Sequence, residues 1–292
     1  MTKVYDIAII GGGIVGMASA KTLANKTEAS LIVLEAEDHL AAHQTGNNSG
    51  VIHSGLYYKP SSLKAQTCTD GREALYTFCE EHGVAYERCG KVVVATSDEE
   101  IPRLQDLQER GTANGLRELQ WLSAEEIQEY EPHVTGVAGL HVPQTGIVDY
   151  TEVTSKYADI VKSRDGEIRT NAEVTDCQQD NNEFILVTPD EEIRAKNVIN
   201  CAGLQSDRVA RLFGAEPDVK IVPFRGEYYE LKPEKHHLVN NLIYPVPDPK
   251  FPFLGVHFTR MIHGGVEAGP NAVLALEREG YTKWDVSLKD SL

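Results

Sequence analysis

The stretch DIAIIGGGIVGMASA, residues 6–20, decides the fold. An apolar run leads into three successive glycines, and small and apolar residues follow at the spacing of a helix. A second apolar run, SLIVLEAE, comes next and carries Glu35 near its end. This order of strand, tight turn, helix and strand predicts a βαβ unit at the start of the chain.

Gly11, Gly13 and Gly16 form a G-x-G-x-x-G pattern between the first strand and the helix. The first glycine permits the tight turn, the second lets the backbone approach a pyrophosphate, and the third packs the helix close to the strand. Free N–H groups and the helix dipole favour phosphate at the helix N-terminus, and Glu35 can accept hydrogen bonds from a ribose. The pattern predicts a dinucleotide site. The competing interpretation is a glycine-rich turn that only packs an α/β unit.

The segment that follows favours FAD over NAD. A nicotinamide enzyme would normally continue with further βαβ crossovers. Here a polar, glycine-broken loop at residues 43–58, a long helix and a change of sheet follow instead.

Capping residues and turn residues divide the rest of the chain. Ser61 or Ser62 is expected to cap a helix that ends at Gly83, and Ser123 with Glu126 predicts a capping box. A β-meander is expected to return to the first sheet through the strand NVINCAG, and antiparallel strands are expected from Val222 onward. We therefore predict an α/β (α+β) fold: a discontinuous Rossmann-like FAD-binding domain at residues 1–90 and 145–217, interleaved with a mixed antiparallel-sheet substrate domain at residues 91–144 and 218–292.

The charge balance excludes some partners. The 292 residues contain 28 Lys and Arg against 44 Asp and Glu, a formal net charge of −16, which argues against nucleic-acid binding. An anionic ligand then needs a local basic pocket. No run is long enough to span a membrane, and the five cysteines have no metal-ligand spacing. We expect a cytoplasmic protein, with peripheral contact to the inner face of the membrane as an additional hypothesis, and we propose no metal.

Four further segments carry a resemblance to a known family. HQTGNNSGVIHSGLYYKPSSLKAQTC, NVINCAGLQSD, VPFRGEYYEL and GVHFTRMIHGGVEAGPNAVLAL, together with the glycine stretch, resemble the L-2-hydroxyglutarate dehydrogenase/oxidase family. This family belongs to the D-amino-acid-oxidase-like, FAD-dependent oxidoreductases. The resemblance implies oxidation of (S)-2-hydroxyglutarate to 2-oxoglutarate by hydride transfer to the flavin, with electrons passed to a quinone or to oxygen.

The resemblance also implies which residues hold the cofactor. The glycine turn would hold the FAD pyrophosphate, Glu35 the adenosine ribose, and the loop after it would run along the flavin. Val174 occupies the position near the adenine, and the small residues that end NVINCAG let the cofactor lie close. The full set is Gly11, Gly13, Gly16, Glu35, Thr45, Gly46, Asn47, Asn48, Ser49, Gly50, Val174, Ala202 and Gly203.

Oxidation of a 2-hydroxy acid needs a cation for the carboxylate and a base for the hydroxyl proton. Arg225 and Arg260 are the candidate clamps, because a guanidinium matches a carboxylate bidentately. His53 and His257 are the candidate bases, and Tyr244 is a candidate hydrogen-bond donor to the substrate. Each has a competing structural interpretation: an arginine paired with one of the many acids, a buried histidine, or a tyrosine that packs.

Two alternative functions remain open. An amine or amino-acid oxidase of the same fold would share the cofactor and differ in substrate. Members of the resembled family continue beyond residue 292 into a segment that returns to the flavin domain, so the resemblance implies that this segment is missing here. The second alternative is therefore a truncated, non-catalytic fragment.

Overall fold

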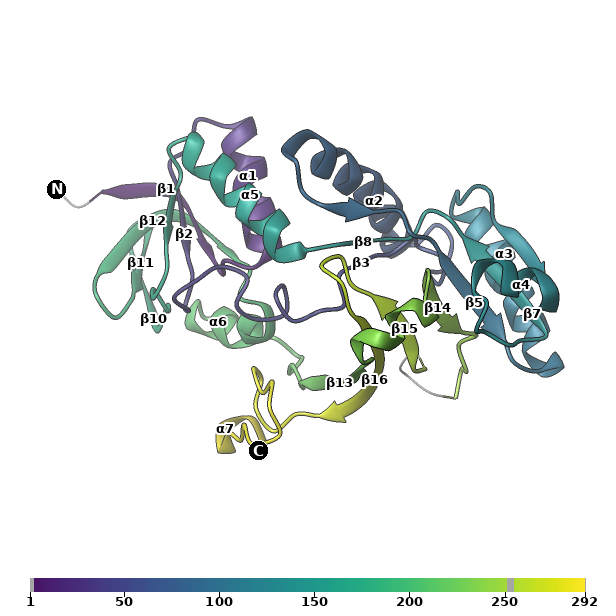
Figure 1. Ribbon diagram of the computed structural model, residues 1–292. Helices are drawn as coiled ribbons and strands as arrows, with labels where there is room; N and C mark the ends of the chain where they lie inside the picture. Colours follow the sequence, from purple (N-terminus) through teal and green to yellow (C-terminus); the bar gives the residue numbers. More distant parts are fainter. Residues whose placement is uncertain (1–2, 251–254, 292) are drawn as a thin grey trace. The chain divides into compact units, whose positions relative to one another are not determined.

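The computed structural model describes residues 3–250 and 255–291. The chain divides into two compact units: residues 1–48, 150–223 and 274–292 form unit 1, and residues 49–149 and 224–273 form unit 2. Each unit has a large sheet of its own with helices packed on it (Figure 1). The predicted mixed α/β class is confirmed.

A six-stranded sheet forms the centre of unit 1. Its four neighbouring strands β12, β1, β2 and β9 are parallel, and β10 and β11 extend it as an antiparallel meander, as predicted. In sheet order the strands are β10 (Asp176–Asp180), β11 (Glu183–Val187), β12 (Glu192–Asn200), β1 (Val4–Ile10), β2 (Leu31–Leu34) and β9 (Glu167–Arg169).

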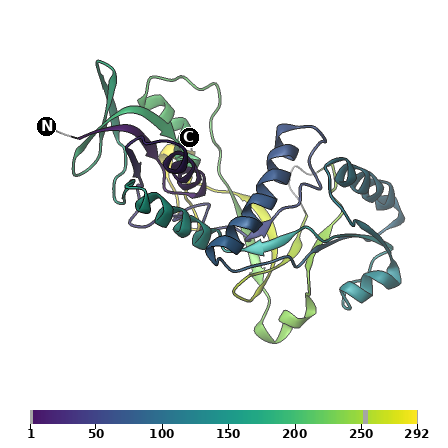
Figure 2. The ribbon, with the colours of Figure 1, turned by 90° about the horizontal axis from the view of Figure 1, so that it is seen from above.

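Helices cover both faces of this sheet. Ile9 and Val33 pack against α1 (Ile14–Lys26) and α5 (Tyr150–Ser163), which lie side by side in Figures 1 and 2. Ala8 and Ile10 point to the opposite face, where α6 (Ser206–Leu212) packs. Because successive strand residues face opposite sides, the continuous apolar run of β1 is buried on both.

A seven-stranded sheet forms the centre of unit 2. Antiparallel pairs form between β16 and β15, β15 and β14, β5 and β7, and β7 and β6. The strands β14 and β5 pair in parallel. In sheet order the strands are β13 (Phe224–Glu230), β16 (Val266–Leu274), β15 (His257–Arg260), β14 (Leu242–Pro245), β5 (Lys91–Ala95), β7 (Ala138–Val142) and β6 (Gln120–Ser123).

Two helices cover opposite faces of this second sheet. Leu104 and Leu107 of α3 (Ile101–Ala113) pack on Val93, whereas Ile127 of α4 (Ala124–Tyr130) packs on Val92. The predicted capping box at α4 is confirmed, because Ser123 accepts from the backbone of Glu126 and Glu126 accepts from the backbone of Ser123.

Unit 2 also contains the long helix α2 (Leu63–His82) and a small three-stranded sheet. In sheet order, the strands of this sheet are β3 (Val51–Ile52), β8 (Gly146–Val148) and β4 (Tyr86–Glu87). Ser62 caps α2 by accepting from the backbone N–H of Ala65, and Gly83 ends it in the left-handed conformation. Of the two predicted caps, the structure selects Ser62. The remaining short helices are η1 (Asp98–Glu100), η2 (Gly203–Gln205), η3 (Pro233–Leu238) and α7 (Leu288–Ser291).

The compact units divide the chain differently from the expected domains. Residues 49–90 and 145–149 were expected with the FAD-binding domain, but they fall in unit 2, where Val51 and Ile147 pack in the same apolar cluster as Val93 of β5. Residues 274–292 were expected with the substrate domain, but they fall in unit 1, where Arg278 binds Asp207 of α6. Within the described residues, no helix combines the length and apolarity that a membrane span requires.

Candidate functional site

The glycine turn of unit 1 brings backbone against backbone. Gly11 adopts a φ of +109°, and a Cβ added there would lie 2.3 Å from the carbonyl oxygen of Cys201. A Cβ on Gly16 would lie 1.9 Å from the carbonyl oxygen of Gly11. Any larger residue would push α1 away from β1. Gly13 is the N-cap and supplies no side chain, so the first turn of α1 presents backbone N–H groups at the carboxyl end of β1.

Two polar side chains hold this turn in shape. Glu35 is buried, and its carboxylate accepts from the backbone N–H of Gly12 at 2.6 Å and of Glu37 at 3.0 Å. Thr45 Oγ1 accepts from the N–H of Ile14 at 3.0 Å. A carboxylate can accept about four hydrogen bonds, so Glu35 keeps capacity for a ribose hydroxyl.

In the predicted flavin loop, at residues 45–50, the side-chain amides of the two asparagines donate to backbone carbonyls a few residues earlier. The side-chain nitrogen of Asn47 donates to the carbonyls of Ala42 and His43, and that of Asn48 donates to the carbonyls of Gln44 and Thr45. These bonds close a tight turn.

Glycines let neighbouring backbone approach this loop. A Cβ on Gly46 would lie 2.5 Å from the carbonyl oxygen of Ala41, and one on Gly50, at a φ of +66°, would lie 2.6 Å from that of Val148. Ser49 between them is half-buried. The predicted contacts of this loop with flavin stay predictions.

The other predicted cofactor residues lie in the same unit as the glycine turn. Val174 is buried in the core on the α6 side of the sheet, and Ala202 packs against that core. Gly203 follows at a φ of +51°. The strand β12 that ends just before Ala202 is the parallel neighbour of β1, so Ala202 and Gly203 lie at the carboxyl end of the parallel strands, where α/β proteins bind ligands.

In unit 2, the loop at residues 53–58 is held from outside by side chains of α2, α3 and the residue that follows α3. Each donates to a backbone carbonyl of the loop, and Gly55 adopts a φ of +94°. The donors thus fix a segment that has no regular structure of its own. The pairs are Cys68 with His53 (3.4 Å), Arg72 with Ser54 (2.7 Å), Arg110 with Tyr57 (3.0 Å), and Asn114 with Gly55 (2.9 Å) and Tyr58 (2.8 Å).

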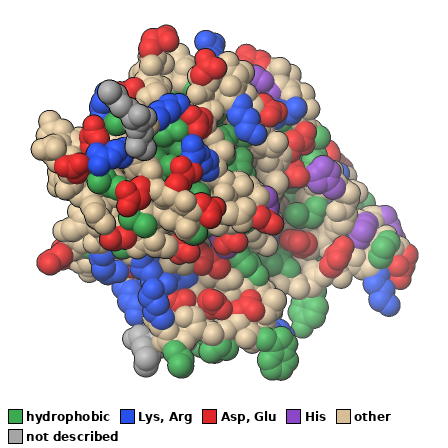
Figure 3. Space-filling view, turned by 90° about the vertical axis from the view of Figure 1, so that its left-hand side faces the viewer, with side chains coloured by type: hydrophobic (Ala, Val, Ile, Leu, Met, Phe, Trp, Pro, Cys, Tyr) green, Lys and Arg blue, Asp and Glu red, His purple; other side chains and the backbone are tan. Residues whose placement is uncertain are grey.

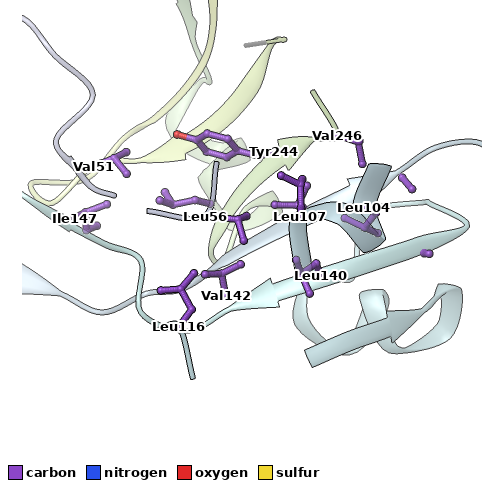
Figure 4. Close-up of a cluster of buried hydrophobic side chains, with 14 residues drawn as sticks. Val51, Leu56, Leu104, Leu107, Leu116, Leu140, Val142, Ile147, Tyr244 and Val246 are labelled. Atoms are coloured by element: carbon purple, nitrogen blue, oxygen red, sulfur yellow. The ribbon is translucent and has the colours of Figure 1, made fainter. Parts of the chain in front are cut away.

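This fixed loop and Lys91 of β5 line a small hollow. Lys91 is 1% exposed, and its Nζ lies 4.5 Å from the ring centre of Tyr57 and 4.9 Å from that of Tyr244. Leu56 and Tyr244 also belong to the buried cluster drawn in Figure 4. Burial lowers the pKa of Lys91 to about 7.

Two predicted bases lie near this lysine. His257 is buried, its ring stacks on Tyr244 with centres 4.1 Å apart, and its Nδ1–H donates to the carbonyl of Gly255 at 2.9 Å. That bond leaves Nε2 as the acceptor of a neutral ring. Burial lowers the pKa of His257, and the charge of Lys91 adds to the effect.

By its solvent-accessible area, His53 is an exposed residue. Even so, desolvation by the atoms packed around it, followed by the charges of Lys91 and His257, lowers its pKa to about 4. Both imidazoles are therefore neutral at pH 7 and able to accept a proton.

The two predicted carboxylate clamps already have acidic partners. Arg225 binds Glu227 at 2.9 Å, and Arg260 binds Glu87. The competing interpretation of each arginine, a pairing with one of the many acids, is therefore present in the structure. Arg260 keeps one buried nitrogen, Nε, without a hydrogen-bond partner.

The whole chain matches one protein family. The sequence model of that family, described as FAD dependent oxidoreductase, matches residues 6–290. The chain belongs to this family. FAD is accordingly its cofactor, and the close-packed glycine turn of unit 1, with glycine as the N-cap of α1, has the form of a dinucleotide-binding turn.

Curated relatives of this chain are named L-2-hydroxyglutarate dehydrogenases. L-2-hydroxyglutarate dehydrogenase of Escherichia coli K12 is 51% identical over 290 residues, which cover 99% of this chain and 68% of that protein. The mitochondrial L-2-hydroxyglutarate dehydrogenase of Homo sapiens is 49% identical over 302 residues, which cover 99% of this chain and 65% of that protein. The chain thus spans about two thirds of the length of these relatives, and the resemblance seen in the sequence is confirmed.

A solved structure shares the fold. The dithionite-reduced L-alpha-glycerophosphate oxidase of Mycoplasma pneumoniae with FAD bound superimposes with a TM-score of 0.88 and 28% sequence identity, over 98% of this chain and 76% of that one.

Lys91 was not among the site residues that the sequence predicted. The run KVVVA is apolar on both faces, so its pattern does not tell which face the lysine shares. The only signal was a lysine that directly begins a fully apolar strand.

Proposed function

We propose that this chain oxidises the C2 hydroxyl of L-2-hydroxyglutarate to the ketone of 2-oxoglutarate. The observation that carries the proposal is the identity of about half of all positions, over 99% of the chain, with proteins named L-2-hydroxyglutarate dehydrogenases. Bound FAD supplies the acceptor for the C2 hydride.

The residues of unit 2 would handle the hydroxyl proton. His53 and His257 are neutral at pH 7, and each can accept a proton as the C–H bond breaks. His257 is oriented for this role by its bond to the carbonyl of Gly255, which directs the lone pair to Nε2. His53 lines the hollow and is the stronger candidate, because its neighbours in the loop are held in place.

The test of His53 is its replacement by alanine. We expect His53→Ala to retain FAD, as measured by flavin absorbance, and to slow flavin reduction by L-2-hydroxyglutarate by roughly 10²- to 10⁴-fold, the usual contribution of a general base. His263→Ala is the matched control, because His263 is exposed and pairs with Asp149. Unchanged reduction kinetics in His53→Ala would assign His53 to structure.

The substrate class is tested on the unaltered protein. Flavin reduction is measured with L-2-hydroxyglutarate, glycine, sarcosine and glycerol 3-phosphate. Reduction by L-2-hydroxyglutarate alone supports the proposal. Reduction by an amine substrate instead would establish the alternative oxidase, and a protein that binds no FAD under any reconstitution condition would establish the non-catalytic fragment.

The glycine turn would hold the pyrophosphate of the cofactor. Gly16→Val would place side-chain atoms inside the contact with Gly11, so we expect FAD affinity to fall by at least about 100-fold, since the phosphates lose aligned N–H groups. Gly71→Ala in α2 is the control, because an added Cβ there meets nothing within 4 Å. FAD titration followed by flavin fluorescence measures both. Normal FAD affinity in a folded Gly16→Val protein would contradict this assignment.

The final electron acceptor is proposed to be a quinone or oxygen, and the protein is proposed to be cytoplasmic with peripheral contact to the inner face of the membrane. Reoxidation of the reduced flavin by oxygen and by a short-chain quinone, measured side by side, separates the two acceptors. Sedimentation with anionic vesicles tests the contact with a membrane.

A further inference from the structure

Lys91 is a buried cation without an acidic partner. Within the described residues its ammonium group makes no ion pair and no hydrogen bond, although the residue is only 1% exposed. The rings of Tyr57 and Tyr244 are its polarisable neighbours, at 4.5 and 4.9 Å. Aromatic faces stabilise an ammonium only in part, and a buried charge normally finds an anion.

The strand register explains why this lysine is buried. Lys91 pairs with Leu242 of β14 and with Val142 of β7, so β5 lies inside the sheet. Alternation along β5 gives Lys91 the same face as Val93, which packs in the large apolar cluster of unit 2. An apolar residue would fit this position without loss of charge solvation. Packing alone therefore does not explain why a lysine occupies this position.

The hollow beside Lys91 carries two more polar groups without partners. The hydroxyls of Ser54 and Tyr57 are buried, line the hollow, and make no hydrogen bond. Ser54 is 1% exposed. Five of the six carbonyls of the loop at residues 53–58 accept from outside side chains, so the loop has little freedom to turn these hydroxyls elsewhere.

An ammonium and two unpaired hydroxyl donors suit a carboxylate, which accepts about four hydrogen bonds. No acid lines the hollow. With a net charge of −16 and acidic side chains scattered over the face drawn in Figure 3, a dianionic substrate needs such a local cation. Arg225 and Arg260 are each already paired with a glutamate.

We propose that Lys91, with the hydroxyls of Ser54 and Tyr57, forms a subsite that binds one carboxylate of the substrate. This proposal rests on the proposed function for the identity of the substrate, and it goes beyond that function by naming the binding group. The ion pair forms inside the protein, where no other anion competes.

Several titratable groups face Lys91 and set its pH dependence. They are His53 and Tyr57 of the loop, Cys68 of α2, Tyr244 of β14 and His257 of β15. None carries a negative charge at pH 7. Carboxylate binding should therefore weaken as the pH rises above about 7 and Lys91 loses its proton.

The first measurement uses glutarate, a five-carbon diacid that has no hydroxyl group to oxidise. Its affinity for the FAD-loaded protein is measured by titration calorimetry. We expect Lys91→Met to weaken glutarate binding by about 10- to 100-fold, the usual effect of losing a charged hydrogen bond, and Ser54→Ala by about 5-fold. The control Lys64→Met removes an exposed lysine that lies over the ring of Tyr58, and should bind normally.

The second measurement identifies the carboxylate. Flavin reduction by L-2-hydroxyglutarate is compared with reduction by (S)-2-hydroxypentanoate, which lacks the distal carboxylate. If Lys91 binds the distal group, Lys91→Met impairs only the diacid; if it binds the carboxylate next to C2, both substrates are impaired. Either result supports the subsite.

Failure of the subsite and failure of the proposed function are distinguishable. Equal glutarate affinity in the unaltered protein and in Lys91→Met would overturn the subsite, even if L-2-hydroxyglutarate reduces the flavin. Lys91-dependent glutarate binding without reduction by L-2-hydroxyglutarate would instead retain the subsite and overturn the proposed function. An unchanged circular dichroism spectrum, together with normal FAD content, shows that both units of Lys91→Met are folded.

Discussion

A buried arginine of unit 1 and a buried lysine of unit 2 have opposite surroundings. In unit 1, the side chain of Arg278 is 2% exposed; it binds both carboxylate oxygens of Asp207 and donates to the carbonyl of Leu204 at 2.7 Å. In unit 2, Lys91 is as deeply buried, but among the described residues no carboxylate contacts it. The first cation joins residues 274–292 to α6. The second lacks an internal counterion, which is the property expected of a group that binds a ligand.

The largest expected effect is the loss of the satisfied pair. Asp207→Asn leaves Arg278 buried without its main counterion, and breaking such a pair costs about 3 kcal/mol or more in the free energy of unfolding. Urea denaturation followed by circular dichroism measures the change. The control is Asp218→Asn at an exposed carboxylate. If Asp207→Asn lowers the free energy of unfolding no more than Asp218→Asn does, Asp207 is not the stabilising counterion of Arg278 and the contrast with Lys91 fails.

The opposite sign is expected at Lys91. Lys91→Met removes a poorly solvated charge from an apolar cluster, so the free energy of unfolding should rise by about 2 kcal/mol at pH 7. The same denaturation experiment measures it, with Lys64→Met as the exposed control. A destabilised Lys91→Met protein would show that the lysine contributes to folding, and the contrast with Arg278 would then disappear.

The smallest expected effects concern pH: the changes in the free energy of unfolding caused by Asp207→Asn and by Lys91→Met should each depend on it. Arg278 holds the pKa of Asp207 well below its usual value of 3.8, so the stability from this pair is present above pH 4 and is lost as the pH falls through the lowered pKa. The pKa of Lys91 falls from 10.5 to about 7, so its destabilising effect is complete below pH 7 and vanishes as the pH rises to 10.5.

The deficit of Asp207→Asn should therefore shrink in acid, and the gain of Lys91→Met should shrink in alkali. Urea midpoints between about pH 2 and pH 10 check both directions, since only groups with shifted pKa values change stability with pH. Parallel curves for the variants and the unaltered protein would refute the assigned charges.

Local features of the fold were predictable from the sequence. The glycine turn between β1 and α1 depends on close backbone contacts that only glycine allows, and these contacts occur at Gly11 and Gly16. The capping box of Ser123 and Glu126 and the end of α2 at Gly83 likewise depend on neighbours within a few residues. Steric and hydrogen-bonding rules act over this range, so the residue types alone are sufficient.

Long-range pairing decided the rest. The sequence indicated His53 and His257 as candidate bases, and the fold brings them near one buried lysine that no pattern indicated. It also gave Arg260 a distant acidic partner, Glu87, whereas Arg225 pairs with Glu227, only two residues along β13. Residues 49–90 belong to unit 2 because Val51 and Leu56 pack in the same apolar cluster as Val93, which lies far along the chain.

The sequence by itself thus determined the glycine turn, the helix caps and the class of cofactor. Only the tertiary structure decided which cation stays buried without an acid. The physical reason is that the solvation and pairing of Lys91 depend on β14, β7 and the loop at residues 53–58, whose positions follow from strand pairing and not from the residues next to the lysine.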